Sequence, residues 1–284
     1  MPSSFRRDPL AERAELSCAL SIGGLDPGGG AGLAADLRAF AIAGVFGCAA
    51  AAALTVQSTS GLKSIRAIGA DLVVAQAREV IAEQRVRAIK TGALASADNV
   101  RKVAELLAIH REIPVIVDPV MIPTRGSARL LATSGLVAMR KNLVPRATLI
   151  TANAPEAEAL TSLRVLDVAS ATAAAHALCE MGARAVLVKG GHLRLTARDA
   201  LDVLAIDGQT ILLRAPRLKI PKLHGGGCML AALIAGHMAH DPRSFARDSR
   251  SMVVDAVRWA RKTHHRLLQK NLRDVGGVLR VLAR

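Results

Sequence analysis

Short apolar runs alternate with longer segments of helical periodicity along most of the chain. The apolar runs cover residues 18–22, 48–55, 88–91, 115–118, 148–151 and 185–189. The helical segments between them cover residues 31–43, 71–83, 97–110, 154–160 and 171–181. Because short buried strands that alternate with helices form βαβ units, this order predicts an α/β fold of three layers, with helices on both faces of a mainly parallel sheet.

A hairpin is expected after these units. Residues 201–206 and 210–213 flank the pair Asp207-Gly208, which favours a tight turn, and we place this hairpin on one edge of the sheet. No Pro- or Ser-rich linker and no internal repeat divides the chain. We therefore expect a single domain over residues 17–284, preceded by a charged N-terminal arm over residues 1–16.

Composition excludes several classes of protein. Hydrophobic residues make up 51% of the 284 positions, which rules out a disordered chain. Aromatic residues make up only 2%, which argues against single-stranded nucleic-acid binders that stack bases on aromatic rings. The four cysteines are far apart and form no CxxC pair, so neither a zinc site nor a disulfide framework is indicated, and a reducing cytoplasm is the expected location.

Residues 39–56 carry no charge and are nearly long enough to cross a bilayer. Ala and Gly dominate this segment, however, and Gly44 and Gly47 interrupt it. We interpret it as a helix end, a turn and a buried strand, and the N-terminus lacks the apolar core of a signal peptide. We expect no membrane partner.

The formal net charge is +15, and the excess of basic residues is greatest at residues 242–284, where eleven Lys and Arg stand against three Asp. Apolar residues recur there at helical spacing, namely Met252, Val253, Ala256, Val257, Ala260 and Leu267. We expect a basic amphipathic helix with a solvated face. No nucleic-acid-binding motif accompanies it, so no specific nucleic-acid partner is expected.

Candidate chemistry follows the strands, because ligands of such sheets bind beyond the carboxyl ends of the strands. Residues 23–32 form a glycine-rich loop that opens a helix, and its free N–H groups suit an anion. The loop matches neither a Walker loop nor GxGxxG, and the absence of any Gly-Lys pair excludes a P-loop enzyme. The alternative is an ordinary tight turn.

Two polar residues follow the next strands. Gln57 offers an amide donor and acceptor that suit the edge of a heterocyclic base, although an isolated Gln is more often an ordinary loop residue. Asp118 stands at the end of an apolar strand, where it can hold Mg²⁺ through water. The alternative is that it caps a helix or fixes the loop by hydrogen bonds.

Asn153 and Glu156 stand three apart at a predicted helix start, where they can order the waters of a metal bound to phosphates. The alternative is a helix cap with an acidic first turn. Lys189 ends a strand beside two glycines and is a candidate partner for a nucleotide phosphate.

A second glycine loop, Gly225–Gly227, opens a long apolar helix. Its backbone N–H groups can stabilise the negative charge that develops in phosphoryl transfer. Cys228 follows at the helix terminus, where a thiolate is favoured, although a small core residue at a helix start is the alternative.

Together these motifs resemble the ribokinase-like superfamily and, within it, the hydroxymethylpyrimidine/phosphomethylpyrimidine kinases of thiamine biosynthesis. The resemblance runs from about Cys18 to about His240. It implies a ribokinase-like fold that transfers the γ-phosphoryl group of ATP, with Mg²⁺, to a pyrimidine hydroxymethyl group or its monophosphate. We accordingly expect a cytoplasmic homodimer whose ligands are ATP and the small pyrimidine.

The resemblance also implies roles for individual residues. On the acceptor side, Gln57 would bind the aminopyrimidine, with Gly24 and Asp26 beside it. Asp118 and Glu156 would organise Mg²⁺.

On the nucleotide side, Lys189 would contact an ATP phosphate, with Asn153 nearby. The Gly225, Gly226 and Gly227 amides would form an anion hole, and Cys228 would lie at the reacting oxygen.

Several positions depart from the usual family pattern. They are Leu25 for Ser, Ala93 for Met, Gly226 for Thr, Met229 for Thr or Ser, and Thr-Arg-Gly at residues 124–126 for a Lys-Ser-Gly-like stretch. These changes predict a roomier pocket and an anion hole with fewer hydroxyl groups.

Three functions remain open at this point: a pyrimidine kinase, a kinase of the same branch that phosphorylates another acceptor such as pyridoxal, and a weakened paralogue that binds a pyrimidine as a regulatory module. Gln57 favours the aminopyrimidine. Gly226 and Met229 keep the third reading open, whereas Asp118 and Cys228 weigh against it. Whether one or both phosphorylations occur is open as well.

Overall fold

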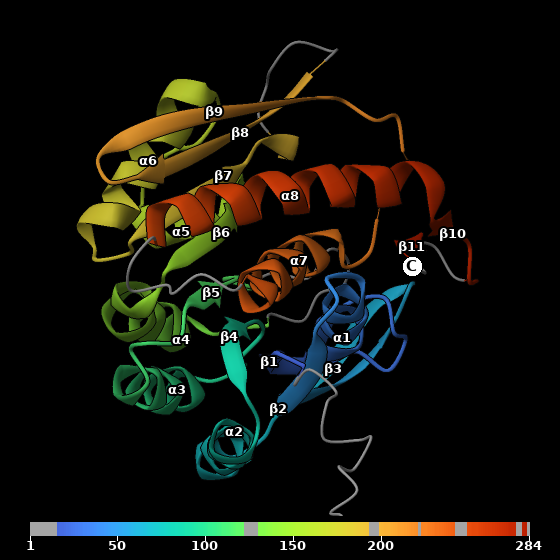
Figure 1. The fold of residues 1–284 in the computed structure, drawn as a ribbon, viewed down its shortest axis with the longest axis vertical. Helices are drawn as coiled ribbons and strands as arrows, with labels where there is room; N and C mark the ends of the chain where they lie inside the picture. Colours follow the sequence, from blue (N-terminus) through green and yellow to red (C-terminus); the bar gives the residue numbers. More distant parts are fainter. Residues whose placement is uncertain are drawn as a thin grey trace, which may run out of the picture.

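The computed structural model describes residues 16–121, 130–192, 199–220, 223–241, 249–276 and 280–282, the side chain of residue 192 excepted (Figure 1). Within them a nine-stranded sheet has the order β3-β2-β1-β4-β5-β6-β7-β8-β9. Its strands are β1 (Cys18–Leu25), β2 (Phe46–Ser58), β3 (Gly61–Ala67), β4 (Val86–Thr91), β5 (Val115–Val117), β6 (Leu149–Asn153), β7 (Ala185–Lys189), β8 (Asp199–Ile206) and β9 (Gln209–Pro216). A separate two-stranded sheet pairs β10 (Leu272–Arg273) with β11 (Val281–Leu282).

The six central strands, from β2 to β7 in the sheet order, are parallel. The edge strands β3, β8 and β9 run antiparallel to their neighbours, and β8 and β9 form the predicted hairpin. The mainly parallel α/β fold is therefore confirmed. The sequence pattern missed β3, because this edge strand is largely solvated and carries Lys63 and Arg66 in place of an apolar run.

Helices cover both faces of this sheet. One face carries α1 (Gly32–Ile42), α7 (Gly226–His240) and α8 (Ser249–Lys270), and α7 packs between the other two (Figure 1). The other face carries α2 (Ala70–Glu83), α3 (Ala97–Ile109), α4 (Thr133–Ala138), α5 (Ala154–Thr161) and α6 (Val168–Glu180). Five of these helices lie close to the helical segments predicted between the strands, namely α1, α2, α3, α5 and α6. The sequence pattern did not predict α4.

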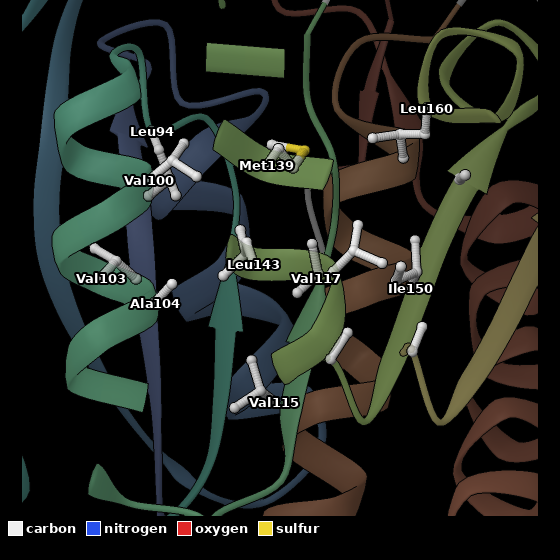
Figure 2. Close-up of a cluster of buried hydrophobic side chains, with 14 of the residues drawn as sticks. Leu94, Val100, Val103, Ala104, Val115, Val117, Met139, Leu143, Ile150 and Leu160 are labelled. Atoms are coloured by element: carbon white, nitrogen blue, oxygen red, sulfur yellow. The ribbon is translucent and has the colours of Figure 1, made fainter. Parts of the chain in front are cut away.

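Figure 2 shows how α3 covers the sheet. Val100 and Val103 point from α3 toward Val115 and Val117 of β5, and all four side chains are at most 3% exposed. The periodicity of α3 places these residues on one face, and burying each valine contributes about 1.5–3 kcal/mol. The four valines belong to one buried cluster on this face of the sheet.

Helix α8 has the predicted amphipathic pattern. Its apolar face is buried at Met252, Val253, Ala256, Val257, Ala260 and Leu267, while Arg258, Lys262 and Arg266 are exposed. Arg261 Nε lies 2.7 Å from Asp202 Oδ2, and Asp202 Oδ1 accepts a hydrogen bond from the Gly190 N–H at 2.6 Å. One carboxylate thus ties α8 to the end of β7.

Residues 39–56 form the end of α1, a turn and most of β2, as predicted. No helix of the described ranges is long and apolar enough to span a membrane. The arm at residues 1–15 and the Thr-Arg-Gly stretch at 124–126 lie outside the described residues. The single-domain expectation stays a prediction.

Candidate functional site

The predicted site residues gather at one edge of the sheet, because the parallel strands all end there. Asp118 follows β5, Lys189 ends β7, and Asn153 ends β6 and begins α5. The N-terminus of α7 lies at the same edge, since a Cβ on Gly227 would be 3.2 Å from Lys189 Nζ.

Lys189 lies between the two carboxylates that were assigned to a metal. Its Nζ is 3.4 Å from Asp118 Oδ1 and 3.8 Å from Glu156 Oε2. Burial alone would lower the pKa of Lys189, but Asp118 and Glu156 raise it, so the ammonium group is charged. Its positive charge balances the two acids when no ligand is bound.

The carboxylates fit a magnesium ion that is held mostly through water and phosphate. Asp118 is 2% exposed, and its Oδ2 has no hydrogen-bond partner in the described part of the chain. Burial raises the pKa of Glu156 to about 7. Lys189 opposes this shift, whereas Asp118 adds to it. No set of three His, Cys, Asp or Glu in those ranges could hold a metal, which matches the one or two carboxylates that Mg²⁺ usually takes from a protein.

Asn153 and Glu156 form a capping box at the start of α5. Asn153 Oδ1 accepts from the Glu156 N–H at 2.9 Å, and Glu156 Oε2 accepts from the Asn153 N–H at 2.8 Å. The helix cap with an acidic first turn, which the sequence analysis gave as the alternative, is therefore present. It does not exclude a ligand role, because Glu156 Oε1 and the Asn153 amide nitrogen take no part in the box.

Gly225 is the N-cap of α7 and has a φ of +77°, which favours glycine. A Cβ there would lie 2.0 Å from the Gly30 carbonyl oxygen, so the two glycine loops touch through their backbones. The first-turn N–H groups of Gly226, Gly227 and Cys228 have no partner within the helix, whereas Gly225, the third glycine of the predicted anion hole, is the N-cap before this turn. With Lys189 beside Gly227, they form a cradle for an anion.

Cys228 lies next to this cradle, in the first turn of α7 and close to Gly32 of α1. Burial raises the pKa of Cys228 to about 12; Lys90 opposes this, while Asp118 and Asp36 add to it. The ligand-free protein therefore holds a thiol and not the thiolate that its helix position suggested. Desolvation outweighs the helix dipole here.

The departures at Gly226 and Met229 have a structural reason. A Cβ on Gly226 would lie 2.4 Å from Leu223 Cδ2, so Leu223 fills the space of the usual Thr side chain. Met229 is 1% exposed and packs in the core on the α7 side of the sheet. The start of α7 accordingly offers backbone N–H groups and no hydroxyl.

The residues predicted to bind the acceptor lie at the ends of β1 and β2. A Cβ on Gly24 would be 3.5 Å from Ala93 Cβ, so a small residue faces Gly24 where the family usually has Met. Gln57 is partly buried, and its Nε2 lies 3.0 Å from His224 Nε2. Two of the predicted substrate-binding residues thus border the same edge as the anion cradle.

Asp26, the third predicted substrate-binding residue, contacts protein groups with both carboxylate oxygens. It accepts from the N–H groups of Gly28 and Ala31, each at 2.9 Å, and contacts His224 Nε2 at 2.7 Å. Burial alone would raise the pKa of Asp26, but His224 and these N–H groups hold it below its usual value. The carboxylate therefore braces the two glycine loops, and substrate contact stays a prediction.

Sequence reasoning assigned no role to three further groups. Lys90 and Asp36 form a buried ion pair close to Cys228, and His224 joins the glycine loops. His264 of α8 lies beside the start of α7, since a Cβ on Gly226 would be 3.8 Å from His264 Nε2. A charged residue within an apolar strand or helix face was the available signal for the ion pair, because a buried charge requires a partner.

Comparison with known proteins agrees with this geometry. The family described as phosphomethylpyrimidine kinase matches residues 26–275. A hydroxymethylpyrimidine/phosphomethylpyrimidine kinase of Mycobacterium tuberculosis (strain ATCC 25618 / H37Rv) is 43% identical over 222 residues, which cover 78% of this chain and 80% of the relative. The thiamine biosynthesis bifunctional protein ThiED of Geobacter sulfurreducens is 35% identical, over 90% of this chain and 53% of its own.

Solved structures show the same fold. An ADP complex of Bacillus subtilis pyridoxal kinase has a TM-score of 0.81 at 25% identity, covering 95% of this chain and 98% of the other. A phosphomethylpyrimidine kinase from Clostridium difficile 630 has a TM-score of 0.74 at 27% identity, covering 88% and 98%. With its ribokinase-like fold, its strand-end motifs and these matches, the chain belongs to the phosphomethylpyrimidine kinase family.

Proposed function

We propose that this chain transfers the γ-phosphoryl group of ATP to 4-amino-5-hydroxymethyl-2-methylpyrimidine, to its monophosphate, or to both, in thiamine biosynthesis. The observation that carries the proposal is the anion cradle: the first turn of α7 lies against Lys189, and Asp118 and Glu156 lie within 4 Å of its ammonium group. Relatives of 39–43% identity bear the name of this activity.

The chain contributes position and positive charge to the transfer. The N–H groups of Gly226, Gly227 and Cys228 point out of the start of α7, where negative charge on the transferred phosphoryl group is stabilised. Lys189 supplies a full positive charge next to them. Phosphoryl transfer depends mostly on such positioning and charge stabilisation, because little covalent chemistry falls to the protein.

Magnesium would be held by Asp118 and Glu156, and when bound it supplies charge neutralisation on the phosphate oxygens. In the ligand-free protein Lys189 balances these carboxylates. Binding of a nucleotide lets Lys189 turn toward its phosphate, which leaves both carboxylates free for the ion and its waters.

The acceptor takes the space beside Gly24 and Ala93, with its ring edge on the Gln57 amide. Cys228 lies next to the cradle and carries its proton in the ligand-free state. It is therefore placed to polarise the acceptor hydroxyl as a hydrogen-bond partner.

We further propose that the enzyme works in the cytoplasm as a homodimer. Its four cysteines are free, as a reducing compartment requires. The outward-facing residues Leu54 and Val56 of β2 are 49% and 57% exposed, which suits burial against a second copy. Light scattering at micromolar concentration would give twice 29.7 kDa for a dimer and that mass once for a monomer.

One experiment separates the candidate functions. ATP consumption is followed in parallel with the pyrimidine alcohol, its monophosphate, pyridoxal and no acceptor, each with magnesium and with EDTA, and products are identified by mass. We expect magnesium-dependent turnover of at least one pyrimidine. Turnover of pyridoxal alone would replace the proposed substrate, and binding of the pyrimidine without turnover would indicate a regulatory module.

A further inference from the structure

His224 is the point at which the two glycine loops are joined by side chains. It precedes the N-cap Gly225 of α7, and its Nε2 lies 2.7 Å from Asp26 Oδ2 in the loop after β1. Both residues are almost completely buried, at 5% and 3% exposure. Asp26 is itself fixed by the N–H groups of Gly28 and Ala31, so the position of His224 is set from the acceptor side of the site.

Gln57 contacts the same nitrogen of His224, at 3.0 Å. That nitrogen carries at most one proton, and the ionised carboxylate of Asp26 attracts it more strongly than a neutral amide does. The Gln57 N–H group then finds no lone pair on His224 Nε2. This contact is therefore much weaker than the bond to Asp26, and a ligand can replace it without moving His224.

We propose that His224 is a positioning residue for the phosphorylation reaction: locked to Asp26, its ring packs against the Gln57 amide, keeps that amide beside the first turn of α7 and leaves the amide N–H for the acceptor ring. The inference rests on the proposed function, because the ligand concerned is the pyrimidine. His224 acts through Gln57 and does not touch the reacting atoms.

The test is a double-mutant cycle on steady-state kinetics. Wild type, Gln57→Ala, His224→Leu and the double variant are compared for KM toward the pyrimidine alcohol, KM toward ATP, and kcat. His224→Leu is expected to raise the acceptor KM about tenfold while the KM for ATP stays within about twofold, since contacting residues couple by up to a few kcal/mol. The double variant is expected to be no worse than Gln57→Ala alone.

A conservative variant and a matched control accompany the cycle. The amide of His224→Gln can still donate to Asp26, so this variant is expected to recover most of the acceptor KM. His176→Leu removes a bond of the same kind, His176 Nε2 to Thr210 Oγ1 at 2.8 Å, between α6 and β9, and is expected to leave both KM values unchanged. Thermal unfolding shows whether His224→Leu folds; if it does not, Asp26→Asn takes its place in the cycle.

Each outcome decides the matter. Additive effects of the two substitutions, or equal rises in the KM values for acceptor and ATP, overturn the inference while wild-type turnover of the pyrimidine upholds the proposed function. Failure of the wild type to phosphorylate either pyrimidine overturns the proposed function, and the role of His224 with it.

Discussion

Lys90 Nζ lies 2.8 Å from Asp36 Oδ2, with both side chains 1% exposed, so a buried ion pair joins the end of β4 to α1. Ser21 Oγ donates to the same carboxylate oxygen at 2.6 Å. Burial alone would lower the pKa of Lys90, but Asp36 raises it above its usual value. Burial also raises the pKa of Asp36, and Lys90 and Ser21 oppose that shift, so the charge of the carboxylate depends on both partners.

Removal of one partner should therefore damage the fold more than removal of both. Lys90→Met leaves the Asp36 carboxylate buried without a cation and is expected to lower the free energy of unfolding by about 3–5 kcal/mol. Lys90→Met with Asp36→Asn should recover much of this loss, because Ser21 can donate to the new amide oxygen. Urea unfolding measures both, and equal losses in the single and double variants would contradict the expectation.

Cys228→Ala tests the thiol at the start of α7. If Cys228 accepts or polarises the acceptor proton, kcat with the pyrimidine alcohol should fall by roughly 10²–10⁴-fold, with nucleotide affinity nearly unchanged. The monophosphate attacks with an oxygen that is already ionised, so its turnover should fall less. Steady-state kinetics with both acceptors measure kcat, and calorimetry with a non-hydrolysable ATP analogue measures nucleotide affinity. Small and equal losses of kcat with the two acceptors would show that Cys228 only packs.

Asp118→Asn tests the carboxylate whose Oδ2 lacks a partner. The amide keeps the shape of the side chain but removes its charge, so the magnesium concentration for half-maximal activity should rise by about tenfold or more. A magnesium titration at saturating ATP measures the change. Asp98→Asn on the exposed face of α3 is the control, since its side chain is 57% exposed, and identical magnesium curves for Asp118→Asn and wild type would remove Asp118 from the metal site.

Gly226→Thr tests whether the usual family residue can return. Its Cβ would collide with Leu223 Cδ2, so the single change is expected to destabilise the protein by about 1–3 kcal/mol through overpacking. Leu223→Ala combined with Gly226→Thr opens the space and should regain part of the melting temperature. Calorimetry measures the melting temperatures of the single and double variants. If Gly226→Thr alone melts at the wild-type temperature, Leu223 moves aside without cost and the expectation is wrong.

His264 gives stability a dependence on pH. Burial lowers its pKa to about 4; Lys189 and His265 also lower it, while Asp202 and the Gly226 backbone oppose the shift. Because the unfolded histidine binds its proton near pH 6.5 and the folded one only near 4, its neutral form stabilises the protein fully above the unfolded pKa. That stability is lost as pH falls from about 6.5 toward 4.

His264→Leu should flatten this slope. Urea unfolding at intervals from pH 4 to 7 is expected to show wild type losing stability faster than the variant as pH falls. Parallel curves for the two proteins would show that His264 does not titrate in this range.

The repeated order of strand and helix was readable from the chain, because buried parallel strands are apolar over their whole length. The edge of the sheet that carries the candidate site could be predicted from this order, since Asp118 and Lys189 each stand at the carboxyl end of a strand. Strand β3 was not readable, because half of its residues face water and its pairing to β2 depends on a tight turn at Ser58–Gly61.

The partners of the site residues were harder to predict than their places. Asp26 and His224 are 198 positions apart, and no local pattern shows that the Asp26 carboxylate and the His224 ring will form a hydrogen bond. The state of Cys228 depended on burial, which a helix-start motif does not report. Both depend on tertiary packing that only the folded chain shows.

Asp202 joins Arg261 of α8 to the Gly190 N–H, directly after Lys189. During synthesis, β7 and Lys189 leave the ribosome some seventy residues before Arg261 does, and a domain generally folds as one unit. Lys189, for which we propose a phosphate contact, therefore lies on a strand that is held at its end only after α8 has been made. A nascent chain stalled ahead of α8 would hold every predicted site residue and still lack the brace behind Lys189, so that activity should begin only once this helix has been made.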